Sequence, residues 1–285
     1  MDGTPRPWRS VLYIPGSKPR ALEKALSLPC DAIIFDLEDA VAAEEKPAAR
    51  AALADWLRTA DYGPRARIVR INDLASPWGA ADCAAFAGIP LEAVLIPKVN
   101  GPDDVQAVAE RIPAAPLWAM METPLAMLNA AAIAAHPRLA GMVMGANDLA
   151  KDIGARHRAD RLPLATSLGL CLLAAKAYGR VIVDGVFNAF RDAEGLAAEC
   201  AQGRDMGFDG KTLIHPDQVP VANAAFAPTA AELDLARRQI AAYEAAVATG
   251  QGVAVVDGRI VENLHVAAAR ATLARAEAIA ALEAA

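Results

Sequence analysis

Short apolar runs alternate with helical segments along most of the chain. The runs have the length and composition of strands buried on both faces, and they lie at 11–14, 32–35, 68–71, 94–96, 117–121, 142–144, 181–183 and 212–214. Helical patterns fall between them, at about 19–28, 44–59, 78–87, 102–111, 124–135, 164–178, 192–205 and 216–225. Buried strands joined by helices are typical of a parallel sheet. Eight such units without an edge-type strand predict an α/β fold, a closed (β/α)8 TIM barrel, with a doubly wound open sheet as the alternative.

The pattern changes after the eighth unit. A helix at about 230–248 is followed by a glycine break, a hairpin and a final Ala-rich helix. The hairpin contains Asp257-Gly258, a sequence that favours a two-residue type I′ turn. We expect a barrel domain at 1–227 and a C-terminal helix–hairpin–helix extension at 228–285. Because the extension follows a complete barrel, it packs on the outside of the barrel or reaches another subunit.

Composition and charge limit the classes of protein that fit. The 285 residues are enough for one barrel of about 250 residues and an appendage. A net charge of -6 and a pI near 5.3 argue against a nucleic-acid-binding surface. Neither a signal segment nor a membrane span is visible, so we expect a cytoplasmic protein without membrane partners. The four cysteines form no CxxC pair, and we expect buried, reduced thiols.

Two acidic residues follow neighbouring apolar runs in the stretch 116–150. Glu122 comes directly after the run 117–121, and Asp148 closely follows the run 142–144. Ligands of parallel α/β folds bind beyond the carboxyl ends of the strands. Mg²⁺ takes one or two carboxylates and completes its shell with water and substrate oxygens. The pair therefore predicts a site for a hard divalent cation, while the alternative is that Glu122 caps a helix and Asp148 closes a turn.

Charged residues also follow the second, third and fourth runs. The second ends in DLED, which brings Asp36, Glu38 and Asp39 to one rim, more acids than local pairing accounts for. Alternation along the third run places Arg70 on one face of its strand, close to the barrel mouth. An arginine there needs an anion, and the candidates are a substrate carboxylate and the acids of the rim, such as Glu38. Lys98 follows the fourth run at the same rim.

Basic residues follow the first run. The segment IPGSKPRALEKA leads from a Gly-Ser loop into a helix whose first turns carry Lys18, Arg20 and Lys24. A helix N-terminus with added cations suits a phosphate, and a solvated basic helix face is the equal alternative. The segment lacks GxGxxG, so it does not indicate a dinucleotide site.

Further candidate residues lie beside the last two runs. Asp184 ends the seventh run, while Lys211 and His215 flank the eighth. His215 stands directly before a proline, where a loop anchor and a catalytic base are equally compatible with the sequence.

Seven motifs occur in one order along the chain: IPGSKPRALEKA, DLEDAV, IVRIN, LIPKV, METP, GANDLA and DGKTLIHP. Together they resemble the citrate lyase β-subunit family of CoA-ester lyases, over residues 9–270. Each motif is weak alone, but seven in order are highly specific. Within the family the chain is most similar to the malyl-CoA branch, and to its (3S)-malyl-CoA thioesterases in particular. The stretches GMVMGANDLAK, CAQGRDMGFDGKTLIHP and GQGVAVVDGRIVENLH carry that closer likeness.

The resemblance implies a (β/α)8 barrel with Mg²⁺ held by Glu122 and Asp148, and with Arg70 on the thioester or carboxylate end of the substrate. It also implies CoA phosphates near Arg20 and Lys24. The family assembles as trimers or hexamers in which the C-terminal segment closes a neighbour's active site. The candidate catalytic residues are therefore Arg70, Glu262, Glu38 and Asp39. The candidate contacts for the CoA thioester are Arg20, Lys24, Tyr13 and Lys98.

One departure from the family pattern bears on the reaction. In lyases of the family the C-terminal segment carries a catalytic Asp in a context such as MIDMP or MVDKP, whereas the matching stretch here, IVENL, holds Glu262 and lacks the proline. Misplacing a catalytic group by about an ångström costs about a hundredfold in rate. We therefore favour hydrolysis of (3S)-malyl-CoA to malate and CoA. The alternatives are a lyase that cleaves malyl-CoA or citramalyl-CoA to an acyl-CoA and a 2-oxo acid, a non-catalytic CoA-binding subunit, and an aldolase of free 2-keto acids.

Overall fold

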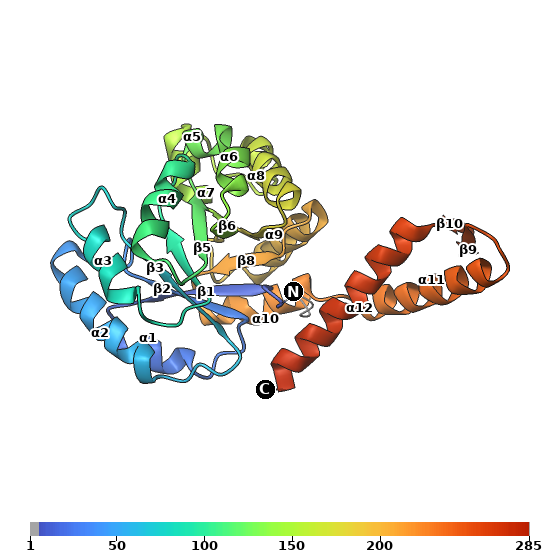
Figure 1. Cartoon of the computed structure of the whole chain (residues 1–285), viewed down its shortest axis with the longest axis horizontal. Helices are drawn as coiled ribbons and strands as arrows, with labels where there is room; N and C mark the ends of the chain where they lie inside the picture. Colours follow the sequence, from blue (N-terminus) through green and yellow to red (C-terminus); the bar gives the residue numbers. More distant parts are fainter. Residues whose placement is uncertain (1–5, 285) are drawn as a thin grey trace. The chain divides into compact units, whose positions relative to one another are not determined.

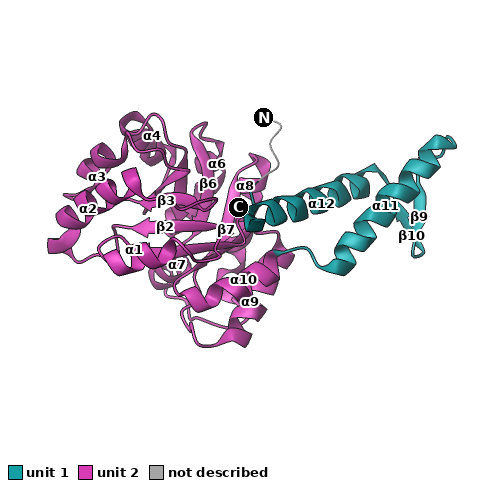
Figure 2. Cartoon of the chain, turned by 90° about the horizontal axis from the view of Figure 1, so that it is seen from below, with its two compact units in different colours: residues 1–7, 227–285 teal, residues 8–226 magenta. Residues whose placement is uncertain are grey.

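The computed structural model describes residues 6–284, which form two compact units. One unit is Trp8–Phe226, and the other contains residues 6–7 and 227–284 (Figure 2). The larger unit is a closed barrel of eight parallel strands, in which consecutive strands pair and β1 also pairs with β8 (Figure 1). The predicted (β/α)8 barrel is therefore confirmed, and the open doubly wound sheet is excluded.

Every strand of the barrel overlaps a predicted apolar run. The strands are β1 (Ser10–Pro15), β2 (Ala32–Asp36), β3 (Ala66–Arg70), β4 (Ala93–Ile96), β5 (Leu117–Met121), β6 (Leu139–Met144), β7 (Val181–Asp184) and β8 (Gly210–Leu213). The helices of this unit are α1 (Pro19–Ala25), η1 (Ala43–Glu45), α2 (Lys46–Thr59), α3 (Gly79–Phe86), α4 (Pro102–Arg111), α5 (Pro124–Leu128), α6 (Ala130–Ala135), α7 (Ala146–Asp152), η2 (Leu162–Leu164), α8 (Ala165–Ala177), α9 (Ala193–Met206), η3 (Pro216–Gln218) and α10 (Val219–Phe226).

Three helices differ from the sequence-based prediction. The helix predicted at 124–135 is divided at Asn129, whose side-chain amide donates to the carbonyl of Asn100 at 2.7 Å instead of facing solvent. The segment GANDLA forms a helix, α7, that the apolar periodicity did not reveal. α1 ends at Ala25, so Lys24 lies in its last turn and not in the first turns, as the sequence had suggested.

Side chains of the strands alternate between the barrel interior and the layer of helices. The interior cluster contains Val11, Ile34, Ile68, Leu95 and Trp118, while a larger cluster joins the outer faces of the strands to the helices. Room for Trp118 comes from Gly141 on the next strand, because a Cβ at that position would lie 2.4 Å from the indole ring. Apolar side chains thus fill the barrel interior, so a ligand site can lie only at the ends of the strands.

Asp184 and Lys211 belong to a buried ion cluster in the barrel wall. Both are fully buried, and Asp184 contacts Lys211 at 3.1 Å and Arg161 at 2.7 Å. Burial alone would raise the pKa of Asp184, but Lys211 and Arg161 hold it below its usual value. A buried carboxylate of this kind is stable only with its partners. Asp184 and Lys211 therefore have a structural role in joining β7 to β8.

The smaller unit is a helix–hairpin–helix. It consists of α11 (Ala230–Ala248), the antiparallel strands β9 (Ala254–Val256) and β10 (Arg259–Val261), and α12 (Asn263–Ala284). Asp257 and Gly258 have φ values of 50° and 74°, which confirms the predicted type I′ turn. A small core joins the hairpin to the helices through Ala246, Ala254, Val261 and Val266. Across residues 6–284, no helix is both long and apolar enough to cross a membrane.

Candidate active site

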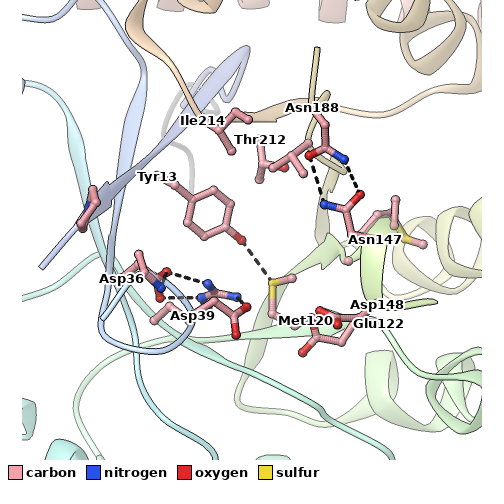
Figure 3. Close-up of a pocket in the computed structure, with 17 residues that line it drawn as sticks. Tyr13, Asp36, Asp39, Met120, Glu122, Asn147, Asp148, Asn188, Thr212 and Ile214 are labelled. Carbon is pink, nitrogen blue, oxygen red and sulfur yellow. Dashed lines mark hydrogen bonds and ion pairs between the residues drawn. The ribbon is translucent and has the colours of Figure 1, made fainter. Parts of the chain in front are cut away.

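A cavity of about 350 Å³ opens where the barrel strands end (Figure 3). Tyr13 of β1, Asp36 of β2 and Arg70 of β3 form one side of its wall. The segments that follow β5 and β6 bring Glu122 and Asp148 to the other side. The carboxyl ends of the strands are the face at which parallel barrels bind their ligands. The structure thus gathers predicted metal ligands and predicted catalytic residues around one cavity.

Glu122 and Asp148 come from adjacent strands and lie close together in Figure 3. Glu122 directly follows β5 and is 1% exposed, and its Oε1 accepts the backbone N–H of Lys98 at 2.7 Å. Asp148 lies in the first turn of α7 and, within residues 6–284, its carboxylate makes no hydrogen bond or ion pair. The backbone that follows β6 passes close to Glu122 at Gly145. Only glycine fits there, because a Cβ would lie 2.2 Å from the Cβ of Glu122.

The capping alternative for Glu122 does not hold. Thr123 is the N-cap of α5, and its hydroxyl accepts the N–H of Ala126 at 3.1 Å. Asp148 lies inside a helix and does not close a turn. Neither carboxylate therefore caps a helix or closes a turn.

The two carboxylates fit a hard divalent cation. Burial, and then the nearby charge of Glu38, raise the pKa of Glu122 to about 7, although Lys98 and Arg70 oppose the shift. A cation that replaces the proton would relieve this cost of a buried charge. Among residues 6–284 there is no group of three or more His, Cys, Asp or Glu side chains that could enclose a metal by themselves. A pair of carboxylates beside an open cavity suits Mg²⁺, which keeps sites for water and substrate.

Arg70 is bound by three acids of its own chain. It is 6% exposed, and Asp36 accepts from Nε at 2.7 Å and from Nη2 at 2.6 Å. Its Nη1 contacts Glu38 at 2.9 Å and Asp39 at 3.2 Å, and its guanidinium stands 5.1 Å from the ring centre of Tyr13. Of the two partners that the sequence left open, the structure has the rim acids. Arg70 also lines the cavity, where a substrate could reach it. Its contact with the substrate stays a prediction.

Glu38, Lys98 and Tyr13 surround the Arg70 cluster. Glu38 is buried, its Oε1 accepts from the ammonium of Lys98, and burial raises its pKa against the influence of Arg70 and Lys98. Tyr13 lines the cavity and donates to the sulfur of Met120 at 3.4 Å. Burial raises the pKa of Tyr13 well above its usual value, so it acts as a neutral phenol.

A pair of asparagines that no sequence motif predicted also lies at this cavity. Asn147 and Asn188 follow β6 and β7 and exchange two side-chain hydrogen bonds, at 3.1 and 2.8 Å (Figure 3). Both line the cavity opposite Tyr13 and offer neutral donors and acceptors. The only signal in the sequence was the place of Asn147 beside Asp148. Asn188 has no such neighbour and could not be found from its position in a loop.

Several predicted site residues do not line the cavity. Arg20 and Lys24 are exposed on α1, and His215 anchors a loop: its Nδ1 accepts the N–H of Asp217 at 3.2 Å, and its ring stacks on that of Phe190. Of the two roles that the sequence left open for His215, the structure shows that of a loop anchor. Glu262 is exposed in the smaller unit, directly after β10.

Comparison with known proteins finds one family. Residues 9–216 match the family described as HpcH/HpaI aldolase/citrate lyase. The (3S)-malyl-CoA thioesterase of Cereibacter sphaeroides (strain ATCC 17025 / ATH 2.4.3) is 68% identical over 275 residues, which cover 96% of each chain. Citrate lyase subunit beta of Escherichia coli (strain K12) is 35% identical over 94% of this chain and 93% of its own.

A solved structure shows the same architecture. The protein CitE of Mycobacterium tuberculosis, in complex with magnesium, acetoacetate and coenzyme A, superposes with a TM-score of 0.81 at 34% identity. The match covers 94% of this chain and 97% of that chain. Family model, relatives and structure agree with the resemblance carried by the seven motifs. The chain belongs to the HpcH/HpaI aldolase/citrate lyase family.

Proposed function

We propose that the protein is a Mg²⁺-dependent (3S)-malyl-CoA thioesterase, which hydrolyses a malyl-type 3-hydroxyacyl-CoA to malate and free CoA. The observation that carries the proposal is the 68% identity to the thioesterase of Cereibacter sphaeroides over 96% of both chains. An identity of this extent includes both the barrel and the C-terminal unit. By the family resemblance, Glu262 matches the catalytic Asp of the lyases, and this difference also supports hydrolysis.

Glu122 and Asp148 would hold the Mg²⁺ ion. Their carboxylates face the same cavity, and Asp148 has no protein partner within residues 6–284. Carboxylates also outnumber cations around the cavity, which favours an added positive charge. The structural relative CitE was crystallised with magnesium. When bound, the ion would polarise a substrate carbonyl and orient the oxygens of the hydroxy acid.

Arg70 would bind the anionic or carbonyl end of the substrate through Nη1. Asp36 occupies its other two nitrogens, so Nη1 is the side that remains available. The Nη1 partner Asp39 is weakly held, at 3.2 Å with 61% of its side chain exposed, and a substrate oxygen can displace it. Glu38 would stay in place and keep the guanidinium oriented.

The CoA part of the substrate would leave the cavity past β1. Tyr13 lines the cavity on this strand, and α1 with its exposed Arg20 and Lys24 follows the same strand. Two flexible cations in solvent suit the phosphates of a nucleotide. The relative CitE was crystallised with coenzyme A, which supports this class of ligand.

The C-terminal unit would supply the base that activates water. In a homotrimer or homohexamer, residues 228–285 of one subunit would close the mouth of the catalytic barrel, residues 1–227, of a neighbour. Glu262 is exposed and lies outside the small core of its unit, so it is free to enter such a site. It would take the proton of the water that attacks the thioester, and the CoA thiolate would leave. A cytoplasmic location stays a prediction.

Carbon–carbon cleavage of malyl-CoA or citramalyl-CoA is the second candidate. It is favoured by the 35% identity to citrate lyase subunit beta, a weaker likeness than that to the thioesterase. The same cavity could bind the substrate in both reactions, so only the products separate them.

Product analysis tests the proposal. Purified enzyme is incubated with (3S)-malyl-CoA and Mg²⁺, and free thiol, malate and glyoxylate are measured separately. Thioester hydrolysis predicts equal amounts of thiol and malate without glyoxylate. Glyoxylate and acetyl-CoA in equal amounts, without free thiol, would identify a lyase and overturn the proposal. Enzyme carrying Glu122→Gln is the control for contaminating thioesterases.

A further inference from the structure

Lys98 has a left-handed backbone, with φ of 52°. Residues with a side chain rarely adopt this conformation, and they keep it only where the surroundings fix it. Hydrogen bonds of neighbouring residues hold the backbone of Lys98 in this conformation. Asn100 donates to the carbonyl of Lys98 at 3.1 Å, and Asn100 itself is bound by Thr123 at 2.6 Å and by Asn129 at 2.7 Å. The turn after β4 is therefore tied to the segment that carries Glu122.

This conformation brings both ends of Lys98 to acids of the candidate site. Its N–H donates to Oε1 of Glu122 at 2.7 Å, and its ammonium binds Oε1 of Glu38. Glu38 in turn contacts Arg70 through Oε2 at 2.9 Å. One residue thus links the carboxylate pair on one side of the cavity to the Arg70 cluster on the other.

The hydrogen bond from Lys98 leaves Glu122 with one free oxygen. Within residues 6–284, Oε2 of Glu122 has no hydrogen-bond partner, while Oε1 is held. A carboxylate held at one oxygen presents the other in a fixed direction, and groups that orient metal ligands in this way are worth about 10- to 100-fold in metal affinity.

We infer that Lys98 is a positioning residue of this site and not a contact for CoA: its left-handed N–H orients Glu122 toward a bound cation, and its ammonium holds Glu38 against Arg70. The part that concerns Glu122 rests on the proposed metal role of that residue. This role replaces the CoA contact that the sequence analysis proposed for Lys98. Both polar ends of Lys98 are held by acids of its own chain, whereas Arg20 and Lys24 are exposed on α1.

Two substitutions isolate the backbone of Lys98. Lys98→Gly and Lys98→Val both remove the ammonium, but only glycine adopts a positive φ at no cost, whereas a β-branched residue resists it. We expect Lys98→Gly to bind Mn²⁺, measured by electron paramagnetic resonance, within about threefold of wild type. Lys98→Val should bind it about 10- to 100-fold more weakly. Equal affinities of the two variants would overturn the orienting role, provided that circular dichroism shows both to be folded.

A second measurement tests the ammonium without any metal. Calorimetric titration with free CoA should give the same affinity for Lys98→Gly as for wild type, while the control Arg20→Ala should weaken binding. A loss in Lys98→Gly as large as that in Arg20→Ala would make Lys98 a CoA contact and refute the inference. If wild-type enzyme bound no Mn²⁺, the proposed metal role of Glu122 would fail, and with it the backbone half of the inference. The CoA titration would still decide whether Lys98 is a contact for CoA.

Discussion

Arg70 and Asp36 form a buried bidentate pair, with parallel hydrogen bonds of 2.7 and 2.6 Å. The same carboxylate accepts the backbone N–H groups of Glu38 at 2.9 Å and of Ala40 at 3.0 Å. Asp36 therefore orients both the arginine and the loop that carries Glu38 and Asp39. The positions of the candidate catalytic residues Arg70, Glu38 and Asp39 therefore depend on Asp36, for which the sequence predicted a place at the rim but no role.

The first prediction concerns this pair. Asp36→Asn keeps the size of the side chain but removes the charge, so the free energy of unfolding should fall by about 2 kcal/mol, the worth of hydrogen bonds to a charged group. Urea denaturation measures this change. Asp55→Asn is the matched control, because Asp55 pairs with Arg58 at 2.6 Å in solvent, where ion pairs contribute little. An equal loss in both variants would contradict the special role of Asp36.

The second prediction concerns the metal. Glu122→Gln and Asp148→Asn should each abolish Mg²⁺-dependent turnover and weaken Mn²⁺ binding, because each removes one of the two carboxylates that face the cavity. Circular dichroism should show an unchanged fold, since neither side chain caps a helix. Wild-type enzyme treated with EDTA should lose turnover and recover it with Mg²⁺. Full activity in the presence of EDTA would refute the metal assignment.

The third prediction concerns pH. Burial raises the pKa of Glu122 from 4.5 to about 7, so metal-free folded protein binds this proton more tightly than the unfolded chain does. The contribution of Glu122 to the free energy of unfolding therefore falls as pH rises from about 4.5 to about 7, and is constant above that range. Glu122→Gln removes this loss. Its stability relative to wild type should increase by roughly 3 kcal/mol between pH 4 and pH 8, from the size of the pKa shift.

The measurement is a series of urea denaturations of both proteins in EDTA across that pH range. Mg²⁺ competes with the same proton, so it should stabilise wild type more at pH 8 than at pH 5 and should not stabilise Glu122→Gln. A difference between the two proteins that does not vary with pH would show that Glu122 has an ordinary pKa.

The barrel and its rim were predictable because they depend on local patterns. A buried strand is a continuous apolar run, and its C-terminal end is marked by the first charged residue, as at Asp36 and Glu122. Strand alternation also predicted that Arg70 lies on one face of its strand close to the barrel mouth, and Arg70 lines the cavity there. These features need only periodicity and the rule that ligands bind at the carboxyl ends of parallel strands.

Which side chains bind each other was not predictable, because these contacts join residues that are far apart in the sequence. Lys98 meets Glu38 and Glu122 only when the closed barrel brings the ends of β2, β4 and β5 to one rim. Its left-handed backbone conformation could not be predicted either, because the residue is not a glycine. The break at Asn129 likewise depends on a hydrogen bond to Asn100. Asp184 has the same strand-end position as Asp36, yet Arg161 from a distant loop makes it structural.

The last prediction concerns Glu262. It is exposed between β10 and α12, and its N–H is bound by Nδ1 of His265 at 3.0 Å, so Glu262→Gln should fold normally. Glutamine keeps the size of the side chain but cannot accept a proton from water. We expect kcat for thioester hydrolysis to fall by roughly 10²- to 10⁴-fold, the usual contribution of a general base, with a nearly constant KM. Glu277→Gln, an exposed change on α12, is the control and should keep full activity.

Subunit mixing tests where Glu262 acts. If the C-terminal unit of one subunit completes the barrel of another, inactive Glu262→Gln and inactive Glu122→Gln subunits should together regain part of the activity, because some sites would combine an intact barrel with an intact Glu262. Mass spectrometry of labelled subunits verifies that exchange has occurred. Verified exchange without recovery would contradict a site shared between subunits. Before mixing, an unimpaired Glu262→Gln enzyme would by itself remove Glu262 from the mechanism, since a base that can be removed without loss is not the base.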